Sequence, residues 1–334
     1  MEAEQSTVVE QVRASVRAGG LLDVAKPLVA MLSGGRDSVC LLDVAVALCG
    51  AERVHALHVN YGLRDAAEAD ERHCVALCRA LGVELAVVRA SDDCDSSVTA
   101  GERGNLQAWA RELRYSAAEQ LAGELGERAL IATGHTASDQ VETILYRLAA
   151  SPGRRALLGM AAAEGRVVRP LLGIAREQTA DYCRARGLVW REDQSNEDER
   201  FARARVRARV VPALRAVHPA AEANVLRTAR LLREEKELLD ALVERELAGQ
   251  TEIELTRLQA LAPALARLVV IRLAEQAAGG YVPQAGERVQ DLLALGRRGG
   301  HAELHVGGQA GAVIEGGRLS MRRLPPREQP PGGD

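Results

Sequence analysis

The stretch LVAMLSGGRDSVCLLDVAVAL, residues 28–48, decides the fold of this chain. Its first part, Leu28–Leu32, is a short apolar run, and Val39–Leu48 is a longer one. We interpret them as a buried strand and a helix joined by the turn SGGRDS at residues 33–38, because helices need longer apolar runs than strands. Two successive glycines let the backbone approach a ligand closely, and a helix starting at about Ser38 points its free N–H groups there. The turn is therefore a candidate anion site.

Several features distinguish this turn from other glycine-rich loops. It lacks the lysine of G-x-x-x-x-G-K-S/T and the spacing of G-x-G-x-x-G. Ser33 and Ser38 supply hydroxyl donors, and Asp37 is a candidate ligand for a magnesium ion held against phosphates. The alternative interpretation is an ordinary Gly-Gly turn in which a serine is the N-cap of the helix.

Outward from this turn, strand and helix patterns alternate along the first two hundred residues. Short apolar runs that alternate with longer helical patterns indicate βαβ units and a doubly wound, mainly parallel sheet. Ligands of such sheets bind beyond the carboxyl ends of the strands. The predicted strands are Leu28–Leu32, Arg53–Asn60, Val83–Ala90 and Arg128–Thr133, and the predicted helices are Val39–Leu48, Ala66–Leu81, Asn105–Gly126 and Ser138–Ala150.

The pattern changes near residue 215, where we place a domain boundary. A long amphipathic helix is predicted at Ala220–Leu247, with shorter helices at Pro263–Ala278 and Gln284–Leu295 and small antiparallel strands after them. The fold class is therefore α/β with a smaller, largely helical C-terminal domain. The predicted parts are a catalytic domain at 1–215, an accessory domain at 216–324 and a disordered tail at 325–334.

The composition excludes several classes of protein. With 43 basic and 46 acidic residues, a formal charge of −3 and 47% hydrophobic residues, the chain does not resemble collagen-like or disordered proteins. No apolar run approaches the ~18 residues of a membrane span, and the acidic start MEAEQSTVVEQ lacks the features of a signal peptide. We therefore expect a cytoplasmic enzyme with no membrane partner.

The cysteines agree with the same compartment, because none forms a C-x-x-C pair and most lie in apolar segments. We expect reduced, buried thiols rather than a disulfide or metal framework. His73, Cys74 and Cys78 lie on one predicted helix face, but a zinc site needs a fourth ligand that no nearby residue supplies. The six cysteines are Cys40, Cys49, Cys74, Cys78, Cys94 and Cys183.

Further motifs follow the turn along the chain. They are HVNYGLR at 58–64, Glu102 with Ala110-Arg111 and Arg114-Tyr115, TGHTASDQVET at 133–143, RPLL at 169–172 and DQSN at 193–196. The turn itself resembles the SGGxDS signature of the PP-loop ATP pyrophosphatases, which adenylate a substrate and hold the pyrophosphate part of ATP in that loop. With the other motifs, the order and spacing over residues 28–215 resemble the tRNA(Ile)-lysidine synthetase family.

Two positions depart from the family pattern. The family usually has HVNHGLR, so Tyr61 stands where a second histidine is common, and Ser138 stands where GHxxDDQxET has its first acid. His58 and Asp139 are retained in the same two motifs. In place of the long additional C-terminal domain of some relatives, we expect one compact accessory domain.

The resemblance implies a two-step ligation that uses ATP and Mg²⁺ and no zinc or iron–sulfur cluster. The 2-oxygen of the wobble cytidine in the CAU anticodon of tRNA(Ile) attacks the α-phosphate of ATP, and pyrophosphate leaves. The ε-amine of free L-lysine then attacks the 2-carbon and AMP leaves, which gives lysidine. Codon reading thereby changes from AUG to AUA and identity from methionine to isoleucine. Family members are often homodimers, although no stretch of this sequence indicates an interface.

Two acidic residues are candidates for the lysine site that the resemblance implies. Asp139 and Glu142 are three apart at the start of a predicted helix, so both carboxylates can face one pocket. That pocket must bind the ammonium of lysine, whose usual pKa is ~10.4, and also allow its deprotonation. A shared magnesium ion is the rival role, and two acids favoured by the helix dipole are the structural alternative. With Asp37, Arg111 and Arg114 they form the expected catalytic set.

Charge that develops on the α-phosphate needs a cation beside it. Arg111 and Arg114 are candidates, as is Arg64, although a single surface arginine is usually only solvated. For the two histidines of the motifs, a structural hydrogen bond at a strand end is the alternative to a contact with ATP. The ATP contacts expected from the resemblance are Ser33, Gly34, Gly35, Arg36, Asp37, Ser38, His58 and His135.

One strongly basic cluster follows these motifs, and it consists of Arg200, Arg203, Arg205, Arg207 and Arg209. Such a run can grip the tRNA backbone. Its members lie on different helix faces, so not all of them can reach one phosphate track. A solvated helix, partly neutralised by the acidic run at 197–199, is the alternative. The expected tRNA contacts are Arg64, Arg203, Arg205, Arg207 and Arg209.

Two other functions compete with lysine ligation. Another PP-loop enzyme, such as a tRNA thiolase, is disfavoured because thiolases commonly use paired cysteines, sometimes with an iron–sulfur cluster. A non-catalytic nucleotide-sensing or RNA-binding module is disfavoured because a binder has no need for the full set Ser33, Asp37, Ser38, Asp139 and Glu142.

Overall fold

The computed structural model describes residues 2–62, 67–90, 103–151, 153–192 and 201–325. The chain divides into two compact units, Met1–Arg230 and Leu231–Asp334. The division falls inside helix α10 (Ala221–Leu247), later in the chain than the boundary predicted near residue 215. Of the predicted tail, all but Pro325 lies outside the described residues.

The first unit is built on a six-stranded sheet with the strand order β3-β2-β1-β4-β6-β5. The strands are β1 (Leu28–Met31), β2 (Val54–Asn60), β3 (Glu84–Arg89), β4 (Leu130–Ala132), β5 (Ala163–Glu164) and β6 (Val167–Val168). All neighbouring pairs are parallel except β5 with β6. The order reverses between β1 and β4, so the loops after these two strands meet at a switch point. The predicted α/β, doubly wound fold is confirmed.

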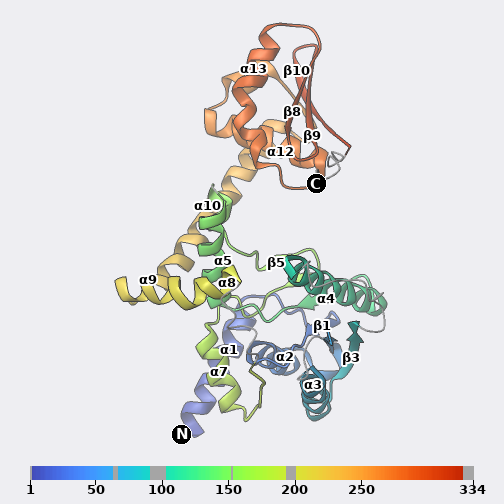
Figure 1. The fold of residues 1–334 in the computed structure, drawn as a ribbon, viewed down its shortest axis with the longest axis vertical. Helices are drawn as coiled ribbons and strands as arrows, with labels where there is room; N and C mark the ends of the chain where they lie inside the picture. The colour runs from blue at the N-terminus through green and yellow to red at the C-terminus, as the bar shows by residue number, and fades with distance from the viewer. Residues whose placement is uncertain (1, 63–66, 91–102, 152, 193–200, 326–334) are drawn as a thin grey trace. The chain divides into compact units, whose positions relative to one another are not determined.

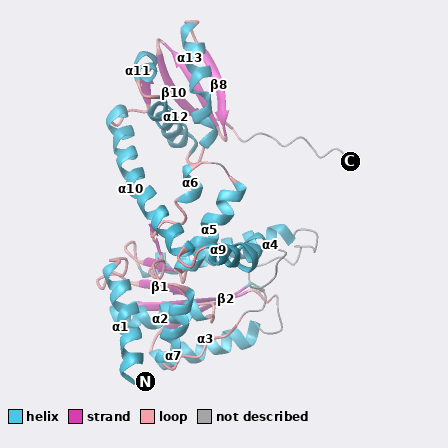
Figure 2. Ribbon diagram, turned by 90° about the vertical axis from the view of Figure 1, so that its left-hand side faces the viewer, coloured by secondary structure: helices cyan, strands magenta, loops and turns pink. Residues whose placement is uncertain are grey.

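Helices cover both faces of this sheet, with α1, α2, α3 and α7 on one side and α4 on the other (Figure 1, Figure 2). Side chains of β1 alternate accordingly: Leu28 and Ala30 pack into the core of the first group, and Val29 and Met31 pack with α4. All four are buried, as expected for a central parallel strand. The helices are α1 (Glu2–Ala18), α2 (Arg36–Cys49), α3 (Ala67–Leu81), α4 (Arg103–Leu125), α5 (Ala137–Ala150), α6 (Arg154–Leu157) and α7 (Arg176–Ala185).

Two differences from the predicted elements bear on the site. α2 begins at Arg36, before the predicted start at about Ser38, so Asp37 lies in its first turn. α1, which no motif indicated, contributes Val12 and Val16 to the core shared with α2 and α7. The face of the sheet behind the SGGRDS turn is therefore covered by helices from both ends of the first unit.

The last part of the first unit packs on α5. It comprises α8 (Ala202–Arg205), a π-helical segment (Val206–Val210) and α9 (Val211–Val217), followed by the start of α10. Val206 and Val211 form a small buried cluster with Val141 of α5. A π-helical turn is wider than an α-helical one and occurs mostly as a single local turn.

The second unit has its own core and a four-stranded antiparallel sheet with the order β7-β10-β9-β8. Its strands are β7 (Glu252–Glu254), β8 (Ala302–Gly307), β9 (Ala310–Glu315) and β10 (Arg318–Arg323). Its helices beyond α10 are α11 (Leu255–Ala260), α12 (Pro263–Ala278), a 3₁₀ segment (Pro283–Arg288) and α13 (Val289–Arg297). The predicted helical C-terminal region with small antiparallel strands is confirmed.

Two surveys of the described residues bear on the predicted compartment and metal content. No helix among them is both long and apolar enough to span a membrane. In the same ranges, no group of three or more His, Cys, Asp or Glu side chains is arranged to hold a metal ion. Cys94 lies outside them. The other cysteines are buried and free, and they are Cys40, Cys49, Cys74, Cys78 and Cys183.

A buried carboxylate ties three helices of the first unit together. Asp43 of α2 accepts the Tyr182 O–H at 2.5 Å and two N–H groups of Arg186 at 3.1 Å each, both from the α7 end. Arg13 of α1 lies 3.5 Å from the same carboxylate. Burial acts to raise the pKa of Asp43, but the hydrogen bonds from Arg186 and Tyr182 outweigh it and hold this pKa below its usual range. The network fixes α7 against α2.

We expect Asp43→Asn to lower the free energy of unfolding of the first unit by about 2 kcal/mol at pH 7, since hydrogen bonds to a charged group contribute ~1.5–3 kcal/mol each. Because the folded-state pKa of Asp43 lies below the unfolded value, the carboxylate stabilises the fold above about pH 4 and loses this effect as the pH falls through the folded pKa. Urea unfolding at pH 7 and pH 3 should therefore show a smaller difference from wild type at pH 3.

The matched control is Asp181→Asn on α7, where the carboxylate is exposed and pairs with the nearby Arg184. It should change the free energy of unfolding by less than about 0.5 kcal/mol. An equal loss in both variants, or a loss in Asp43→Asn that does not depend on pH, would contradict the expectation.

Candidate active site

The phosphate loop, residues 33–38, runs from the end of β1 into the first turn of α2. The Ser38 hydroxyl donates to the Gly35 carbonyl at 2.8 Å and accepts the Ser33 N–H at 3.2 Å. The Ser33 hydroxyl accepts the Gly35 N–H at 3.3 Å. Gly35, which has no side chain, is the N-cap of α2, so neither serine caps the helix. The first-turn N–H groups of α2 have no intrahelical acceptor and are available to an anion.

Two glycines allow close packing around the phosphate loop, one against α3 and one against the loop after β4. Gly34 has φ of 81°, in the left-handed region that favours glycine, and a Cβ there would lie 3.3 Å from the Cys74 sulfur. Gly134 follows β4, and a Cβ there would lie 3.1 Å from backbone atoms of Asp37 and Ser38. The absence of a side chain at Gly134 thus lets the second loop pack directly on the start of α2.

The start of α5 presents the two predicted acids. Thr136 is the N-cap, and its N–H and hydroxyl donate to Asp139 Oδ2 at 2.8 and 2.7 Å. This capping box leaves Asp139 Oδ1 for other partners. Glu142 is one turn later, and only 5% of its side chain is exposed. The local sequence therefore holds both carboxylates in place from their own helix.

One guanidinium joins these acids to the phosphate loop. Arg176, the first residue of α7, donates to Asp139 at 2.7 Å and to Glu142 at 3.2 Å, and its Nε lies 3.7 Å from Asp37 Oδ2. The Thr179 hydroxyl, also on α7, donates to the other oxygen of Asp37. Residues from α2, α5 and α7 thus meet at one point. Arg176 was not among the predicted site residues, and the only sequence signal is its place shortly after RPLL.

Arg176 also affects the ionisation of Asp139. Burial acts to raise the pKa of Asp139, but the Arg176 charge and the hydrogen bonds from Thr136 hold this pKa below its usual range. Arg36, the remaining charged residue of the phosphate loop, lies 3.4 Å from Asp37 through its Nε. The Asp139 carboxylate therefore lies, ionised, in a cluster that contains both positive and negative side chains.

Arg207, which the sequence analysis predicts to contact tRNA, pairs with Glu142 of α5 in this structure. Its Nε and Nη2 donate to the two oxygens of Glu142 at 2.7 and 2.9 Å. Its hydrogen bonds to the Glu142 carboxylate raise the pKa of Arg207 above its usual value. We call Asp37, Asp139, Glu142, Arg176 and Arg207 the acid cluster.

His135 lies next to the acid cluster and is held neutral. Its Nδ1 lies 2.7 Å from the Thr133 hydroxyl. Burial lowers the pKa of His135 to about 4, the positive charges of Arg169, Arg114 and Arg111 act in the same direction, and Asp139 opposes them. A neutral imidazole at this position can donate or accept a hydrogen bond without repelling a cation.

Arg111 and Arg114 lie on α4 beside the ring of Tyr115. Their guanidinium carbons are 4.6 and 5.9 Å from the ring centroid. Arg114 Nε, Tyr115 Oη and Arg169 Nε are buried without a hydrogen-bond partner among the described residues. Buried donors that lack a partner are costly, so these atoms suit an anionic group of a substrate.

His58 was predicted either to contact ATP or to make a structural hydrogen bond at a strand end. In this structure it makes a structural hydrogen bond. Its Nδ1 lies 2.9 Å from the Leu32 carbonyl, which can only accept, so this nitrogen carries the proton. The other ring nitrogen, Nε2, is buried without a partner among the described residues. His58 therefore supports the end of β1 and keeps one acceptor unused.

Both departures from the family pattern have local structural roles. Tyr61 donates its O–H to the Ala110 carbonyl at 3.0 Å and packs edge-on against Trp109, with ring centroids 6.0 Å apart. It thereby joins the end of β2 to α4. Ser138 accepts the backbone N–H of Arg176 at 3.3 Å, which positions the start of α7.

Several predicted positions lie apart from the acid cluster. Arg203 is exposed on α8, as are Arg205 at its end and Arg209 in the π-helical segment. Among the described residues, no ion pair connects these three arginines to the phosphate loop. Other predicted positions lie outside the described residues, and they are Arg64, Glu102, Arg200 and the motif at 193–196.

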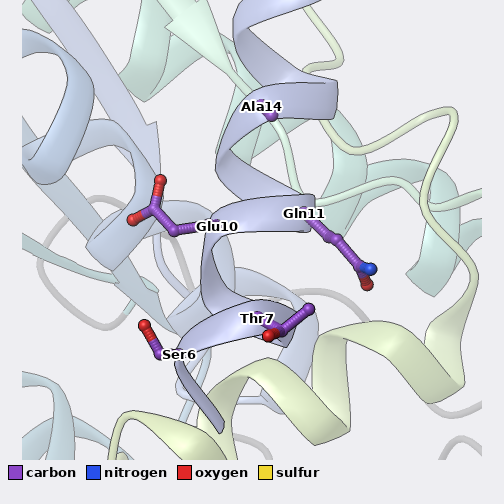
Figure 3. A pocket seen from close by; sticks show the side chains of 5 residues that line it. All are labelled: Ser6, Thr7, Glu10, Gln11 and Ala14. Atoms are coloured by element: carbon purple, nitrogen blue, oxygen red, sulfur yellow. The ribbon is translucent and has the colours of Figure 1, made fainter. Parts of the chain in front are cut away.

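A shallow depression on the first unit is separate from these residues. It follows α1 and is lined by Ser6, Thr7, Glu10, Gln11 and Ala14 (Figure 3). It includes no member of the phosphate loop or the acid cluster. The candidate active site is therefore the switch point between β1 and β4 and not this depression.

The parallel sheet, the glycine turn after β1 and the switch point define a PP-loop domain. The family model described as the PP-loop domain matches residues 5–214. Among solved structures, the U34-tRNA thiolase NcsA from Methanococcus maripaludis with its 4Fe-4S cluster superposes with a TM-score of 0.57 at 18% identity. The superposition covers 69% of this chain and 80% of that chain. At this identity the likeness concerns the fold alone.

Curated relatives narrow the family further. A tRNA(Ile)-lysidine synthase of Nocardia farcinica is 36% identical over 308 residues, which cover 90% of this chain and 93% of the relative. Those of Pseudomonas syringae pv. tomato and Pseudomonas aeruginosa are 38% and 39% identical over 65% and 63% of this chain. The chain spans about half the length of these two, at 48% and 47%. The chain belongs to the tRNA(Ile)-lysidine synthase family.

We expect Gly134→Ala to disturb the phosphate loop, because the new Cβ would press on the backbone of Asp37 and Ser38 at 3.1 Å. Overpacking of this kind costs about 1–3 kcal/mol. Calorimetric titration should show weaker nucleotide binding, and thermal unfolding should show a lower midpoint.

Gly173→Ala is the matched control, because a Cβ there meets nothing within 4 Å and the position does not have a left-handed φ. It should retain the wild-type affinity for nucleotide. Wild-type affinity in Gly134→Ala would show that the two loops do not need this close contact.

We expect His135 to stay neutral throughout the range in which an ordinary histidine titrates, because its pKa is lowered to about 4. Since protonation near pH 6.5 then occurs only in the unfolded chain, the fold should lose stability as the pH falls from about 6.5 to about 4. The measurement is the proton NMR titration of the ring, with the signal assigned by its loss in His135→Gln. A midpoint near 6.5 would contradict the expectation.

Proposed function

We propose that the chain ligates free L-lysine to the 2-carbon of the wobble cytidine in the CAU anticodon of tRNA(Ile), with ATP as the activating substrate. The observation that carries this proposal is the convergence of Asp37, Asp139 and Glu142 on Arg176 beside the phosphate loop. Carboxylates that suit an amine thus adjoin a loop that suits a triphosphate. The name of the relatives refers to the same product.

The phosphate loop is the proposed site of the ATP phosphates. The positive end of α2 stabilises an anion there by ~0.3–1 kcal/mol before any hydrogen bond is counted. Asp37 fits a magnesium ion, because its side chain is 22% exposed and its Oδ2 lies 3.7 Å from Arg176 Nε, which is longer than a hydrogen bond. Mg²⁺ is usually bound by one or two carboxylates together with substrate phosphates, whose charge it neutralises.

The carboxylates of the acid cluster support lysine as the second substrate. The cluster's three carboxylates are paired with its two guanidinium groups and with Arg36 beside Asp37. An ammonium group would compete with these arginines, and Asp139 and Glu142 supply the acceptors that its three donors need. Before the amine attacks, it must lose a proton, and a carboxylate of the cluster is the nearest base.

The partly unsatisfied arginines support the adenylation step. Arg114 Nε and Arg169 Nε are buried without a partner among the described residues, and Arg111 lies on the same helix as Arg114. These groups supply positive charge for the α-phosphate when the cytidine oxygen attacks it and pyrophosphate leaves. The neutral His135 interacts electrostatically with these arginines and with Asp139, and it can hold a phosphate or ribose oxygen by a hydrogen bond.

The tRNA would be held by basic residues of the first unit together with the second unit. Arg203, Arg205 and Arg209 are exposed and suit the RNA backbone. Arg64, the last residue of the motif HVNYGLR, is also proposed to contact the tRNA. We further propose that the protein is cytoplasmic and that two copies of the chain form a homodimer.

The test is incorporation of radiolabelled lysine into a tRNA(Ile) transcript with a CAU anticodon, in the presence of ATP and Mg²⁺. Methionine tRNA, which carries the same anticodon, is the control RNA. We expect label in the isoleucine transcript alone, with AMP and pyrophosphate as products. Asp37→Asn should lose at least about 100-fold in rate if Asp37 acts at the phosphates, since single groups of this kind contribute 10²–10³-fold.

Asp181→Asn is the matched control variant, because its carboxylate is exposed on α7 away from the acid cluster. It should incorporate lysine at the wild-type rate. AMP formation with bulk tRNA but no lysine incorporation would retain the nucleotide site and reject lysine as the substrate. Sulfur incorporation instead of lysine would favour the tRNA thiolase alternative.

A further inference from the structure

Arg207 connects two parts of the first unit that the proposed function treats separately. It lies in the π-helical segment Val206–Val210, within the arginine cluster expected to contact tRNA. Its guanidinium nevertheless makes a two-point hydrogen bond with Glu142, which lies in the proposed lysine site. Arg207 therefore lies in the segment that we expect to bind RNA, while its side chain contacts Glu142 of the proposed lysine site.

The backbone around Arg207 is built to give this contact. Val206 on one side and Val211 on the other are buried against Val141 of α5, one residue before Glu142. These apolar contacts fix the segment on α5 and direct Arg207 toward Glu142. The ion pair consequently does not depend on the exposed arginines of the segment.

The two partners of this ion pair differ in their freedom to move. The Glu142 side chain is 5% exposed and also accepts a hydrogen bond from Arg176, whereas the Arg207 side chain is 37% exposed. Arg176 is only 19% exposed and contacts all three carboxylates of the cluster. If one cation leaves Glu142, geometry favours the departure of Arg207.

An incoming lysine competes for the same carboxylate. Glu142 Oε1 already accepts from both arginines, and Oε2 accepts from Arg207. An ammonium at Asp139 and Glu142 would offset part of the negative charge of these two carboxylates and weaken the attraction that holds Arg207. A nearby RNA phosphate would then be the stronger partner for this guanidinium.

We propose that Arg207 links the two binding events: lysine takes over Glu142, and the released Arg207 binds a phosphate of the tRNA. The inference rests on the proposed function, because it takes lysine and tRNA as the ligands. Linkage is reciprocal, so lysine should tighten the binding of tRNA by the same factor by which tRNA tightens the binding of lysine. Each substrate thereby prepares the enzyme for the other.

The experiment measures the dissociation constant of the full chain for the unmodified tRNA(Ile) transcript by filter binding, without ATP so that no reaction occurs. The measurement is made with saturating L-lysine hydrochloride and with an equal ionic strength of sodium chloride, because salt alone weakens RNA binding. In wild type we expect lysine to tighten tRNA binding about fivefold or more, the lower end of usual coupling between sites.

Two arginine variants of the same segment separate coupling from simple charge. Arg207→Gln should bind tRNA with the same affinity in the presence and absence of lysine. Arg203→Gln is the matched control, because this arginine is exposed on α8 and removes the same charge. It should weaken tRNA binding by the same factor in both conditions and so retain the lysine effect.

Each outcome decides the inference. No effect of lysine on tRNA binding in wild type overturns it, and this measurement does not require any variant to fold. A full lysine effect in Arg207→Gln, or its loss in Arg203→Gln, also overturns it. Failure of the proposed function is distinguishable, because the wild-type chain would then incorporate no labelled lysine. If lysine is incorporated but does not affect tRNA binding, the proposed function stands and only the linking role of Arg207 is rejected.

Discussion

The Arg176 guanidinium contacts three carboxylates from two helices, and the arrangement of the site depends on it. Asp37 belongs to the phosphate loop, whereas Asp139 and Glu142 belong to α5. Without a cation between them, these three negative charges would repel one another. Arg176 can act in this way because Ser138 holds its backbone N–H and because α7 is fixed on α2. Arg176 thus holds the phosphate loop and the start of α5 together at one site.

The site combines groups of opposite charge. The acid cluster supplies three carboxylates, and Arg111, Arg114 and Arg169 supply positive charge. His135, whose pKa is lowered to about 4, interacts with Asp139 and with these arginines without adding a charge of its own. An amine and a phosphate can therefore be held near each other while each is attracted to groups of the opposite charge. A ligation between an amine and a phosphate-activated carbon needs both kinds of group.

The sequence indicated the local parts of this architecture but not their long-range connections. The phosphate loop was predictable because glycines, serines and the flanking apolar runs act within a few residues. Asp139 and Glu142 were predictable because helix spacing places them together. Arg176 and the orientation of Arg207 were not, since each depends on contacts with residues 34 or more positions away. For the same reason no motif revealed that α1 and α7 cover the sheet behind the loop.

The Asp43 network has a consequence for the order in which the protein is made. Asp43 leaves the ribosome 139 residues before Tyr182, and Asp37 leaves it 142 residues before Thr179. Before α7 is synthesised, Asp43 has Arg13 nearby but lacks the hydrogen bonds from Tyr182 and Arg186, so burying α2 on the sheet is less favourable. The contact between the phosphate loop and α7 therefore forms late, 142 residues after Asp37 has been synthesised. Because a ligand stabilises only the state that binds it, we expect nucleotide to stabilise a nascent chain less before α7 emerges than after it.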